Sequence, residues 1–592
     1  MFCSTLLANT FFLQTRKAVS INTPSRQYYL LNMADADIRN DIYVLALENA
    51  VKHKAVPRAG AILGSVMGAH PELRSKAKEI NALIPEILEE VAALSIEERE
   101  EKLMSLNPGA IEKMHEKKER SHELPDLPNA ESGVVMRFAP NPSGPLHLGH
   151  ARASVLNDYY VKKYGGKFYY RVEDTDPKRV DPSAYEMVSE DLAWLGIGIT
   201  DVVYQSDRFA IYYEYARKLL ELGGAYMCTC DNNEFREKKL KKIACPCREI
   251  SVEENLKRFD DMLAGKYAEG EITLRVKTDI AHPDPAVRDF AAMRVLTSTP
   301  HPRKPAIFVY PLMNFSVAVD DHLLGMTHVI RGKDHIANTR RQEYIYNYFG
   351  WKMPYFYHYG RMSIAGLELS TSGMRKGINE GLYTGWDDIH LGTLRALARR
   401  GIQPEAVRAA TIDIGMGDTD ISFSWENLFA QNKAVIDAGA DRYFFVPDAV
   451  EVEIAGAPKT EAHAPVYPNQ PERGERVLPF TGRVLLPKSE MEKGGMLRLK
   501  DLFNINITGP NSAEYAGDSL AEARSQKAAI VQWLPTETAA PCSLLTPEGI
   551  QEGFSEPAVL GYLGRIVQFE RVGFSKIDAV NDGKVIAYFT HR

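Results

Sequence analysis

The sequence is poor in cysteine, has no long apolar run and carries no strong excess of either charge. Of its 592 residues, 71 are basic and 78 are acidic, which gives a net charge of −7 at pH 7. Contact with a polyanion therefore requires a local basic surface rather than the charge of the whole chain. Because the sequence has no run of about 18 apolar residues, we expect no membrane partner and place the protein in the cytoplasm.

Four of the six cysteines fall within twenty residues, as two Cys-x-Cys pairs separated by fourteen residues. Two close thiol pairs across a short loop predict a tetrahedral Zn²⁺ site that leaves no position open for catalysis. Buried free thiols and a disulfide are the alternatives, because Cys-x-Cys is tighter than the usual Cys-x₂-Cys spacing. The predicted metal ligands are Cys228, Cys230, Cys245 and Cys247.

Residues 1–32 contain three basic residues and no acidic residue. This composition is typical of a transit peptide. The alternative is an over-long start, with Met33 opening the protein as "MADADIRNDIY". Since the segment lacks a clear amphipathic, Arg-rich helix, we favour the second interpretation and expect residues 1–32 to be unstructured.

The stretch from Val134 to Val172 predicts a strand, a helix and a second strand. Residues 134–139 are a short apolar run that the prolines of "PNPSGP" stop, because proline lacks a backbone donor. Leu148, Ala151 and Val155 then recur at helical spacing. Such a unit makes its two strands parallel, and ligands bind at the carboxyl ends of parallel strands. Residues 325–364 repeat this order of elements.

The segment after the first predicted strand suits a nucleoside triphosphate. "PLHLGH" places His147 and His150 at the start of a helix, where unpaired amides and the helix dipole attract phosphate. A histidine donor there would stabilise charge at the attacked α-phosphate, and Gly149 would let the adenine approach the backbone. The ATP-binding candidates are Pro140, Asn141, Pro142, Ser143, Gly144, Pro145, Leu146, His147, Leu148, Gly149 and His150.

Three segments together resemble the class I aminoacyl-tRNA synthetases, in the form found in glutamyl and glutaminyl enzymes. "RFAPNPSGPLHLGH" is similar to the first signature of that family, "YYRVEDTDP" to the next element and "DDHLLGMTHVIRGKDH" to the third. Their order, their spacing and the intervening insertion also match, so the resemblance covers residues 33–592. A helical extension before the core and β structure after it resemble the archaeal glutamyl-tRNA synthetases.

The resemblance implies a multidomain α/β fold whose catalytic core is a Rossmann-type parallel sheet. It implies, in order, an extension (1–32), a helical amino-terminal domain (33–125), a first catalytic half (130–225), an acceptor-stem-binding insertion with the four cysteines (226–300), a second catalytic half (301–380), a helical stem-contact region (381–445) and antiparallel β-barrels that bind the anticodon (446–592).

The implied activity is ligation of L-glutamate to tRNA(Glu), with ATP and Mg²⁺. Glutamate's α-carboxylate attacks the α-phosphate of ATP, and the terminal ribose hydroxyl of tRNA then displaces AMP from the adenylate. In this family the first step commonly needs bound tRNA. Whether tRNA(Gln) is also charged stays open, no DNA partner is expected, and the sequence indicates no oligomeric state.

Glutamate carries two carboxylates and one ammonium group, so its pocket needs cations and an anion. Planar guanidinium groups bind carboxylates bidentately, and Arg137 and Arg331 stand at the ends of predicted strands. Glu173 is the predicted partner of the ammonium group, and the resemblance implies substrate contacts at these positions and at Asn141. Met313 departs from the family, where a tyrosine is common near the side-chain carboxylate.

"LELSTSGMRKGI" resembles the K-M-S-K-S loop of the family, but Glu368 and Thr371 replace its two lysines. The hydroxyl groups there still suit phosphate, and a nearby cation would stabilise the leaving pyrophosphate. The candidates in this loop are Ser370, Thr371, Ser372, Arg375 and Lys376.

Two other functions remain as alternatives. A glutaminyl-tRNA synthetase has the same fold, but glutaminyl enzymes lack the arginine of "VIRGKD". The missing loop lysines also allow a catalytically decayed tRNA-binding scaffold, which would show no pyrophosphate exchange.

Overall fold

The computed structural model describes residues 26–53, 55–70, 73, 76–107, 109, 123–367, 369–468 and 470–592. These residues fall into two compact units that divide after Ser121. Residues 1–25 of the predicted extension lie outside the described residues, and residues 26–32 belong to the first helix. Within the described ranges, no helix is both long and apolar enough to cross a bilayer.

The first unit is helical, as its 3.6-residue apolar pattern predicts. Apolar side chains of its described helices form its core, among them Leu47, Ile62, Ile84 and Leu103. A capping box at Ser95 begins the helix of residues 96–106, because the Ser95 hydroxyl accepts from the Glu98 amide and the Glu98 carboxylate accepts from the Ser95 amide. The helices are α1 (Arg26–His53), α2 (Ala59–Ala69), α3 (Ala77–Ala92) and α4 (Ile96–Leu106).

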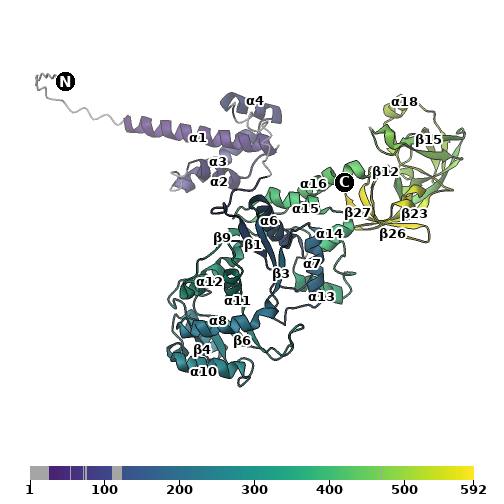
Figure 1. The fold of residues 1–592 in the computed structure, drawn as a ribbon. Helices are drawn as coiled ribbons and strands as arrows, with labels where there is room; N and C mark the ends of the chain where they lie inside the picture. The colour runs from purple at the N-terminus through teal and green to yellow at the C-terminus, as the bar shows by residue number, and fades with distance from the viewer. Residues whose placement is uncertain are drawn as a thin grey trace, which may run out of the picture. The chain divides into compact units, whose positions relative to one another are not determined.

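The second unit contains the parallel sheet that the sequence predicts. β1 (Val134–Phe138) pairs in parallel with β2 (Gly166–Val172), and β2 with β3 (Asp201–Tyr204). The crossover helix α6 (Leu148–Tyr164) packs on β1 and β2 (Figure 1). Gly166 lies at a φ of +134°, and a Cβ there would stand 1.8 Å from the carbonyl oxygen of Val134, so only glycine fits where the chain re-enters the sheet.

The second βαβ unit is also confirmed. β8 (His328–Gly332) and β9 (Tyr355–Tyr359) are parallel and are joined by α12 (Ile336–Phe349). β8 lies beside β1, where the amide of Thr327 donates to the carbonyl oxygen of Val135 at 3.0 Å. The two halves therefore present the carboxyl ends of β1, β2 and β8 close together.

Between the halves, an antiparallel sheet carries the cysteines. Its strand order is β4 (Ala225–Cys228), β5 (Thr273–Val276), β6 (Phe290–Val295) and β7 (Val309–Pro311). The helices before, within and after this segment are α7 (Ala184–Trp194), α8 (Phe209–Glu221), α9 (Asn232–Leu240), α10 (Val252–Leu263) and α11 (Met313–Leu323).

Residues 381–445 contain the helices α14 (Leu394–Arg400), α15 (Pro404–Ile414) and α16 (Trp425–Ile436). The helix α13 (Thr371–Asn379) precedes them, and the short strand β10 (Met362–Ser363) pairs in parallel with β11 (Ile421–Ser422). α14 is attached at both ends: the amide of Leu394 donates to the carbonyl oxygen of Leu146 at 2.9 Å, and Arg400 Nη2 donates to the carbonyl oxygen of Thr590 at 3.1 Å.

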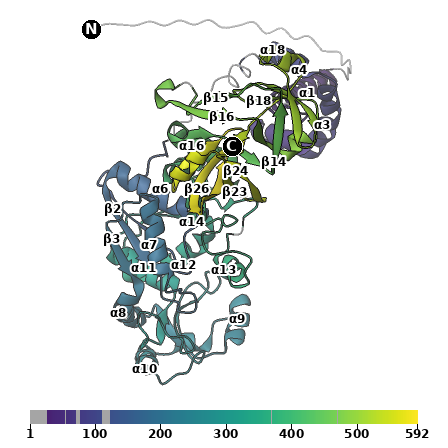
Figure 2. The ribbon, with the colours of Figure 1, turned by 90° about the vertical axis from the view of Figure 1, so that its right-hand side faces the viewer.

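The carboxyl-terminal part forms two seven-stranded, barrel-like sheets, coloured green to yellow in Figure 2. Most of their pairs are antiparallel, while β12–β25, β23–β27, β14–β20 and β18–β21 are parallel. One sheet contains β12 (Asp441–Tyr443), β13 (Phe445–Pro447), β23 (Ala540–Thr546), β24 (Gly549–Ser555), β25 (Ile566–Phe569), β26 (Gly573–Asn581) and β27 (Lys584–His591). The other contains β14 (Ala449–Ala455), β17 (Arg483–Pro487), β18 (Met496–Leu499), β19 (Asn504–Gly509), β20 (Ser512–Tyr515), β21 (Ala529–Val531) and β22 (Leu534–Pro535).

A two-stranded ribbon, β15 (Thr460–Pro465) with β16 (Glu475–Phe480), and the short helices α17 (Lys488–Met491) and α18 (Leu520–Ser525) complete this part.

Candidate functional site

One cavity of about 910 Å³ opens where the parallel strands end. Arg137 lies at the end of β1, Glu173 directly follows β2, and Arg331 lies near the end of β8. All three line this cavity together with His147 and His150. The structure thus brings the predicted glutamate and ATP residues to one hollow.

The proline-rich loop between β1 and α6 is fixed from both sides. Asn141 Nδ2 donates to the carbonyl oxygen of Glu173 at 2.8 Å, and the Glu173 amide donates to the carbonyl oxygen of Pro140 at 3.1 Å. The amide of Leu146 donates to a carboxylate oxygen of Asp191 at 2.7 Å. Pro140, Asn141, Ser143 and Gly149 face the cavity, while Pro142, Gly144, Pro145, Leu146 and Leu148 are buried.

The two histidines of this loop are held with their Nδ1 atoms as acceptors. His147 Nδ1 accepts from the Gly149 amide at 3.1 Å, and His150 Nδ1 accepts from the His147 amide at 3.4 Å. Their rings stack with centroids 3.8 Å apart. A Cβ on Gly149 would lie 2.9 Å from Cε1 of His147, so a larger residue would displace the ring. This arrangement leaves an Nε2–H donor on each ring.

Both rings are neutral at pH 7. Burial lowers the pKa of His147 to about 4. Burial and the neighbouring His147 hold the pKa of His150 well below its usual value. The histidines therefore present dipolar N–H donors rather than full positive charges, and they avoid repulsion between two imidazolium groups.

Lowering the pH is expected to destabilise the protein through these rings. The unfolded state binds the His147 proton near pH 6.5, whereas the folded state binds it near pH 4, so stability falls as the pH drops through this window. We expect His147→Gln to reduce the loss of melting temperature between pH 7 and pH 5. Calorimetry at both pH values checks this, and an identical loss in the variant contradicts it.

A buried network fixes the first arginine. Arg137 Nε lies 3.2 Å from Asp321 Oδ1, and Arg171 donates to the same carboxylate and to Glu173, the latter at 3.0 Å. Burial would raise the pKa of Asp321, but the charges of Arg137 and Arg171 outweigh it and lower this pKa to about 2. The positive charge of Arg137 is thus already paired.

Arg331 has a different environment. Its side chain is 7% exposed, and its Nη2 donates to Thr339 Oγ1 at 2.6 Å and to Gln342 Oε1 at 2.9 Å. Both acceptors are neutral, and among the described residues no carboxylate forms an ion pair with Arg331. Burial and the charge of Arg137 lower the pKa of Arg331 to about 9, so it remains a cation at pH 7. A buried cation without a counterion is a site for an anionic ligand.

The loop that follows β10 lies partly at the cavity. Ser370 caps α13 by accepting from the Gly373 amide at 3.2 Å, its hydroxyl lies 2.9 Å from that of Ser372, and Thr371 lines the cavity. Arg375 instead pairs with Asp181 at 2.7 Å, and Lys376 lies 3.8 Å from Glu380. Arg375 also donates to the carbonyl oxygen of Ser143, which lines the cavity, whereas Lys376 does not line it. Glu368 lies outside the described residues.

Other cations line the cavity and were missed by the sequence reasoning: Arg152, Arg179 and Arg361. Arg152 is buried and donates to the carbonyl oxygens of Gly360 and Gly415, so it fixes the backbone beneath the cavity. Arg361 lies two residues after the end of β9, and its position near a strand end was the signal that could have identified it. Its side chain is 69% exposed and pairs with the exposed carboxylate of Asp420 at 3.3 Å.

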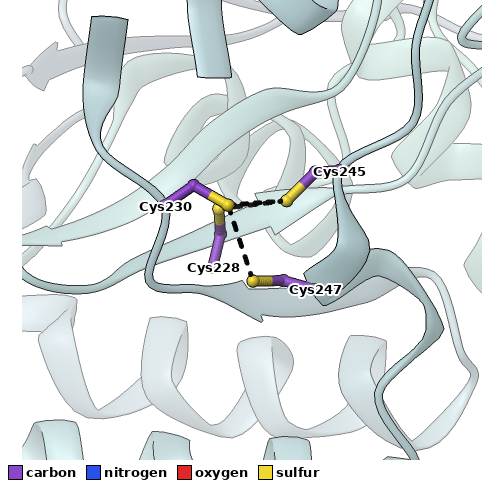
Figure 3. A group of neighbouring side chains, drawn as sticks. All are labelled: Cys228, Cys230, Cys245 and Cys247. Atoms are coloured by element: carbon purple, nitrogen blue, oxygen red, sulfur yellow. Dashed lines mark hydrogen bonds between the residues drawn. The ribbon is translucent and has the colours of Figure 1, made fainter. Parts of the chain in front are cut away.

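The four cysteines of the insertion converge (Figure 3). Cys228 ends β4, Cys230 follows it, and Cys245 and Cys247 approach from the other side of the loop. Their sulfur atoms all lie within 4.8 Å of one another, with pairs at 3.1, 3.6 and 3.8 Å. Zn–S bonds of about 2.3 Å in a tetrahedron require sulfur pairs about 3.8 Å apart. The cluster could therefore hold one metal ion.

The cysteines are free thiols in the part of the chain that the structure describes. Cys542 is buried in the carboxyl-terminal β structure, apart from the cluster.

Comparison with known proteins places these features in a family. Residues 133–438 match the model described as tRNA synthetases class I (E and Q), catalytic domain. Residues 440–521 and 530–578 match two models of the anti-codon binding domain of the same group.

The chain is also similar to curated archaeal proteins over nearly its whole length. It is 60% identical to "Glutamate--tRNA ligase" of Methanoculleus marisnigri and 60% identical to that of Methanospirillum hungatei, covering 94% of this chain and 100% of each relative. It is 50% identical to "Glutamate--tRNA ligase" of Methanocaldococcus jannaschii, over 93% of this chain and 99% of the relative.

Proposed function

The chain belongs to the class I tRNA synthetases of the E and Q group, and from this premise we propose that it is a glutamate–tRNA ligase of the archaeal type. It activates L-glutamate with ATP and transfers the glutamyl group to tRNA(Glu), releasing AMP and pyrophosphate. The observation that carries the choice of glutamate is Arg331, a buried guanidinium group with only neutral partners among the described residues.

The site offers complementary charges to each part of the amino acid. Arg331 provides a cation for a carboxylate, and Glu173 lines the same cavity as the anion for the ammonium group. Binding a carboxylate beside Arg331 would supply the missing counterion, whereas the neutral amide of glutamine would leave the guanidinium group unpaired. This difference favours a glutamyl over a glutaminyl enzyme.

Activation requires positioning more than it requires a reactive side chain. The α-carboxylate oxygen of glutamate attacks the α-phosphorus of ATP, the bond to the pyrophosphate oxygen breaks, and the Nε2–H groups of His147 and His150 donate to phosphate oxygens. Mg²⁺ bound to ATP would reduce the negative charge of its phosphates. Arg361, at the exposed edge of the cavity, is our candidate for the cation that meets the leaving pyrophosphate.

The terminal ribose hydroxyl of tRNA then attacks the carbonyl carbon of the adenylate, and AMP leaves. We propose that residues 226–300 contact the acceptor stem and that the sheets of residues 446–592 bind the anticodon. The family models for residues 440–521 and 530–578 support the second assignment.

Charging assays with purified tRNA(Glu) and tRNA(Gln) test the function. We expect glutamate to be attached to tRNA(Glu), and the tRNA(Gln) arm decides whether the enzyme also serves that acceptor. Attachment of glutamine in place of glutamate would identify a glutaminyl enzyme. Absence of pyrophosphate exchange with glutamate and tRNA present would instead favour a decayed scaffold.

We propose that the metal of the cysteine cluster is structural zinc. Four thiol groups with tetrahedral spacing and an apolar cover that includes Phe235 and Ile250 fit this ion. We expect one zinc per chain by elemental analysis, and less than one tenth of it in a Cys245→Ser variant. Cys542→Ser, which changes a thiol outside the cluster, should keep its zinc. Equal zinc content in all three proteins contradicts the site.

A further inference from the structure

Arg137 and Arg331, which both line the cavity, differ in what neutralises their charge. Arg137 shares the buried carboxylate of Asp321 with Arg171, so its charge is balanced inside the protein. Among the described residues, Arg331 donates to a hydroxyl oxygen and an amide oxygen, and its guanidinium group lies 5.0 Å from the centre of the Phe356 ring. The proposed function uses the charge of Arg331 but does not explain why the protein leaves it unbalanced.

Both neutral acceptors come from one face of α12. Thr339 and Gln342 are three residues apart, and their side chains therefore lie next to each other on the helix. Gln342 is fully buried, and its Oε1 accepts from Arg331 Nη2 at 2.9 Å. The guanidinium plane is thus held by groups that carry no charge.

The amide of Gln342 does not give every polar atom of this contact a hydrogen-bond partner. Gln342 Nε2 and Arg331 Nε are both buried and have no hydrogen-bond partner. A glutamate at this position has nearly the same shape, would accept from Arg331 with a full charge and would leave no unpaired amide N–H. The chain therefore keeps a neutral amide at a position where a carboxylate would neutralise Arg331 within the protein, and binding of an anionic ligand offers a reason for this choice.

We propose that Gln342 is a specificity-determining positioning residue: it orients Arg331 through a neutral acceptor and so reserves the guanidinium charge for the side-chain carboxylate of glutamate. The α-carboxylate is common to glutamate and glutamine, so discrimination rests on the side-chain group. If residue 342 were an acid, its carboxylate would neutralise the Arg331 guanidinium group. The side-chain carboxylate of glutamate would then approach an ion pair without net charge. This inference rests on the proposed glutamate–tRNA ligase function.

The test compares Gln342→Glu with Gln342→Met in the full-length enzyme, by pyrophosphate exchange with tRNA present. We expect Gln342→Glu to raise the KM for glutamate about 100-fold, because two like charges then compete for one guanidinium group. Gln342→Met removes the acceptor without adding charge and should raise this KM less than about tenfold. The KM for ATP should stay within about twofold in both, which a general structural defect would not allow.

A second pair of variants, at position 339, tests the inference if a variant at position 342 fails to fold. Thr339 is only partly buried, and Thr339→Asp and Thr339→Asn differ by a charge at nearly constant shape. Thr339→Asp should raise the KM for glutamate at least tenfold more than Thr339→Asn.

These experiments distinguish failure of the inference about Gln342 from failure of the proposed glutamate–tRNA ligase function. An unchanged KM for glutamate in Gln342→Glu, or equal increases in the acidic and neutral variants, overturns the inference while the unaltered enzyme still charges tRNA(Glu). Absence of glutamate-dependent exchange in the unaltered enzyme overturns the proposed function, and the inference with it.

Discussion

Replacing Arg331 with alanine is expected to lower kcat/KM for glutamate about 1000-fold, which corresponds to about 4 kcal/mol of lost transition-state binding. The guanidinium group is buried and pairs with no carboxylate of the described chain, so a substrate carboxylate loses its whole counterion when the side chain is removed. Solvent cannot replace it fully, because water is largely excluded from that part of the cavity.

Steady-state pyrophosphate exchange with varied glutamate and with varied ATP measures this effect. The KM for ATP should change less than threefold, since the histidine loop is fixed by contacts that do not involve Arg331. Arg340→Ala is a matched control, because Arg340 lies on the exposed face of the adjoining helix α12. Unaltered glutamate use in Arg331→Ala would show that another group binds the discriminating carboxylate.

Replacing Asp321 with asparagine is expected to lower the free energy of unfolding by about 3 kcal/mol. Asp321 lies between Arg137 and Arg171, and the asparagine amide would leave two buried guanidinium groups with one carboxylate, that of Glu173. Removing one partner of a buried ionic network is costly because the remaining charges stay desolvated.

Acid should reproduce the same loss in the unaltered protein. The carboxyl of Asp321 titrates near pH 2 when folded and near pH 3.9 when unfolded, so its stabilisation is complete above pH 3.9 and disappears as the pH falls toward 2. Calorimetry of the variant should therefore show a weaker pH dependence in this window. Asp260→Asn, which breaks an exposed pair with Arg217, should cost less than about 1 kcal/mol. Equal stability of the two variants would contradict the network.

The parallel sheet, and the residues at the carboxyl ends of its strands, could be predicted from local sequence. The apolar run of β1, the helical spacing in α6 and the glycines at 165 and 166 are short-range signals, and they place Arg137 and Glu173 at strand ends. Arg331 could be predicted in the same way because β8 repeats the pattern.

The counterions of these arginines could not be predicted, because they depend on packing between distant segments. Asp321 is 184 residues from Arg137 along the chain, and nothing in "AVDDHLL" tells that Asp321 pairs with Arg137 while the equally buried Asp320 pairs with Arg208. For the same reason the sequence could not tell that Arg375, one of the two candidate loop cations, pairs with Asp181 of another segment. Arg361 was overlooked although it lies close to a strand end, the kind of position that identified Arg137 and Arg331.

The double attachment of α14 has a mechanical consequence. Its first residue hydrogen-bonds to the loop that carries His147, and its last residue hydrogen-bonds to Thr590 in the final strand of the chain. α14 has only seven residues over which a displacement could be absorbed. A shift of that strand would therefore strain one of these two hydrogen bonds unless the loop that carries His147 moved with it.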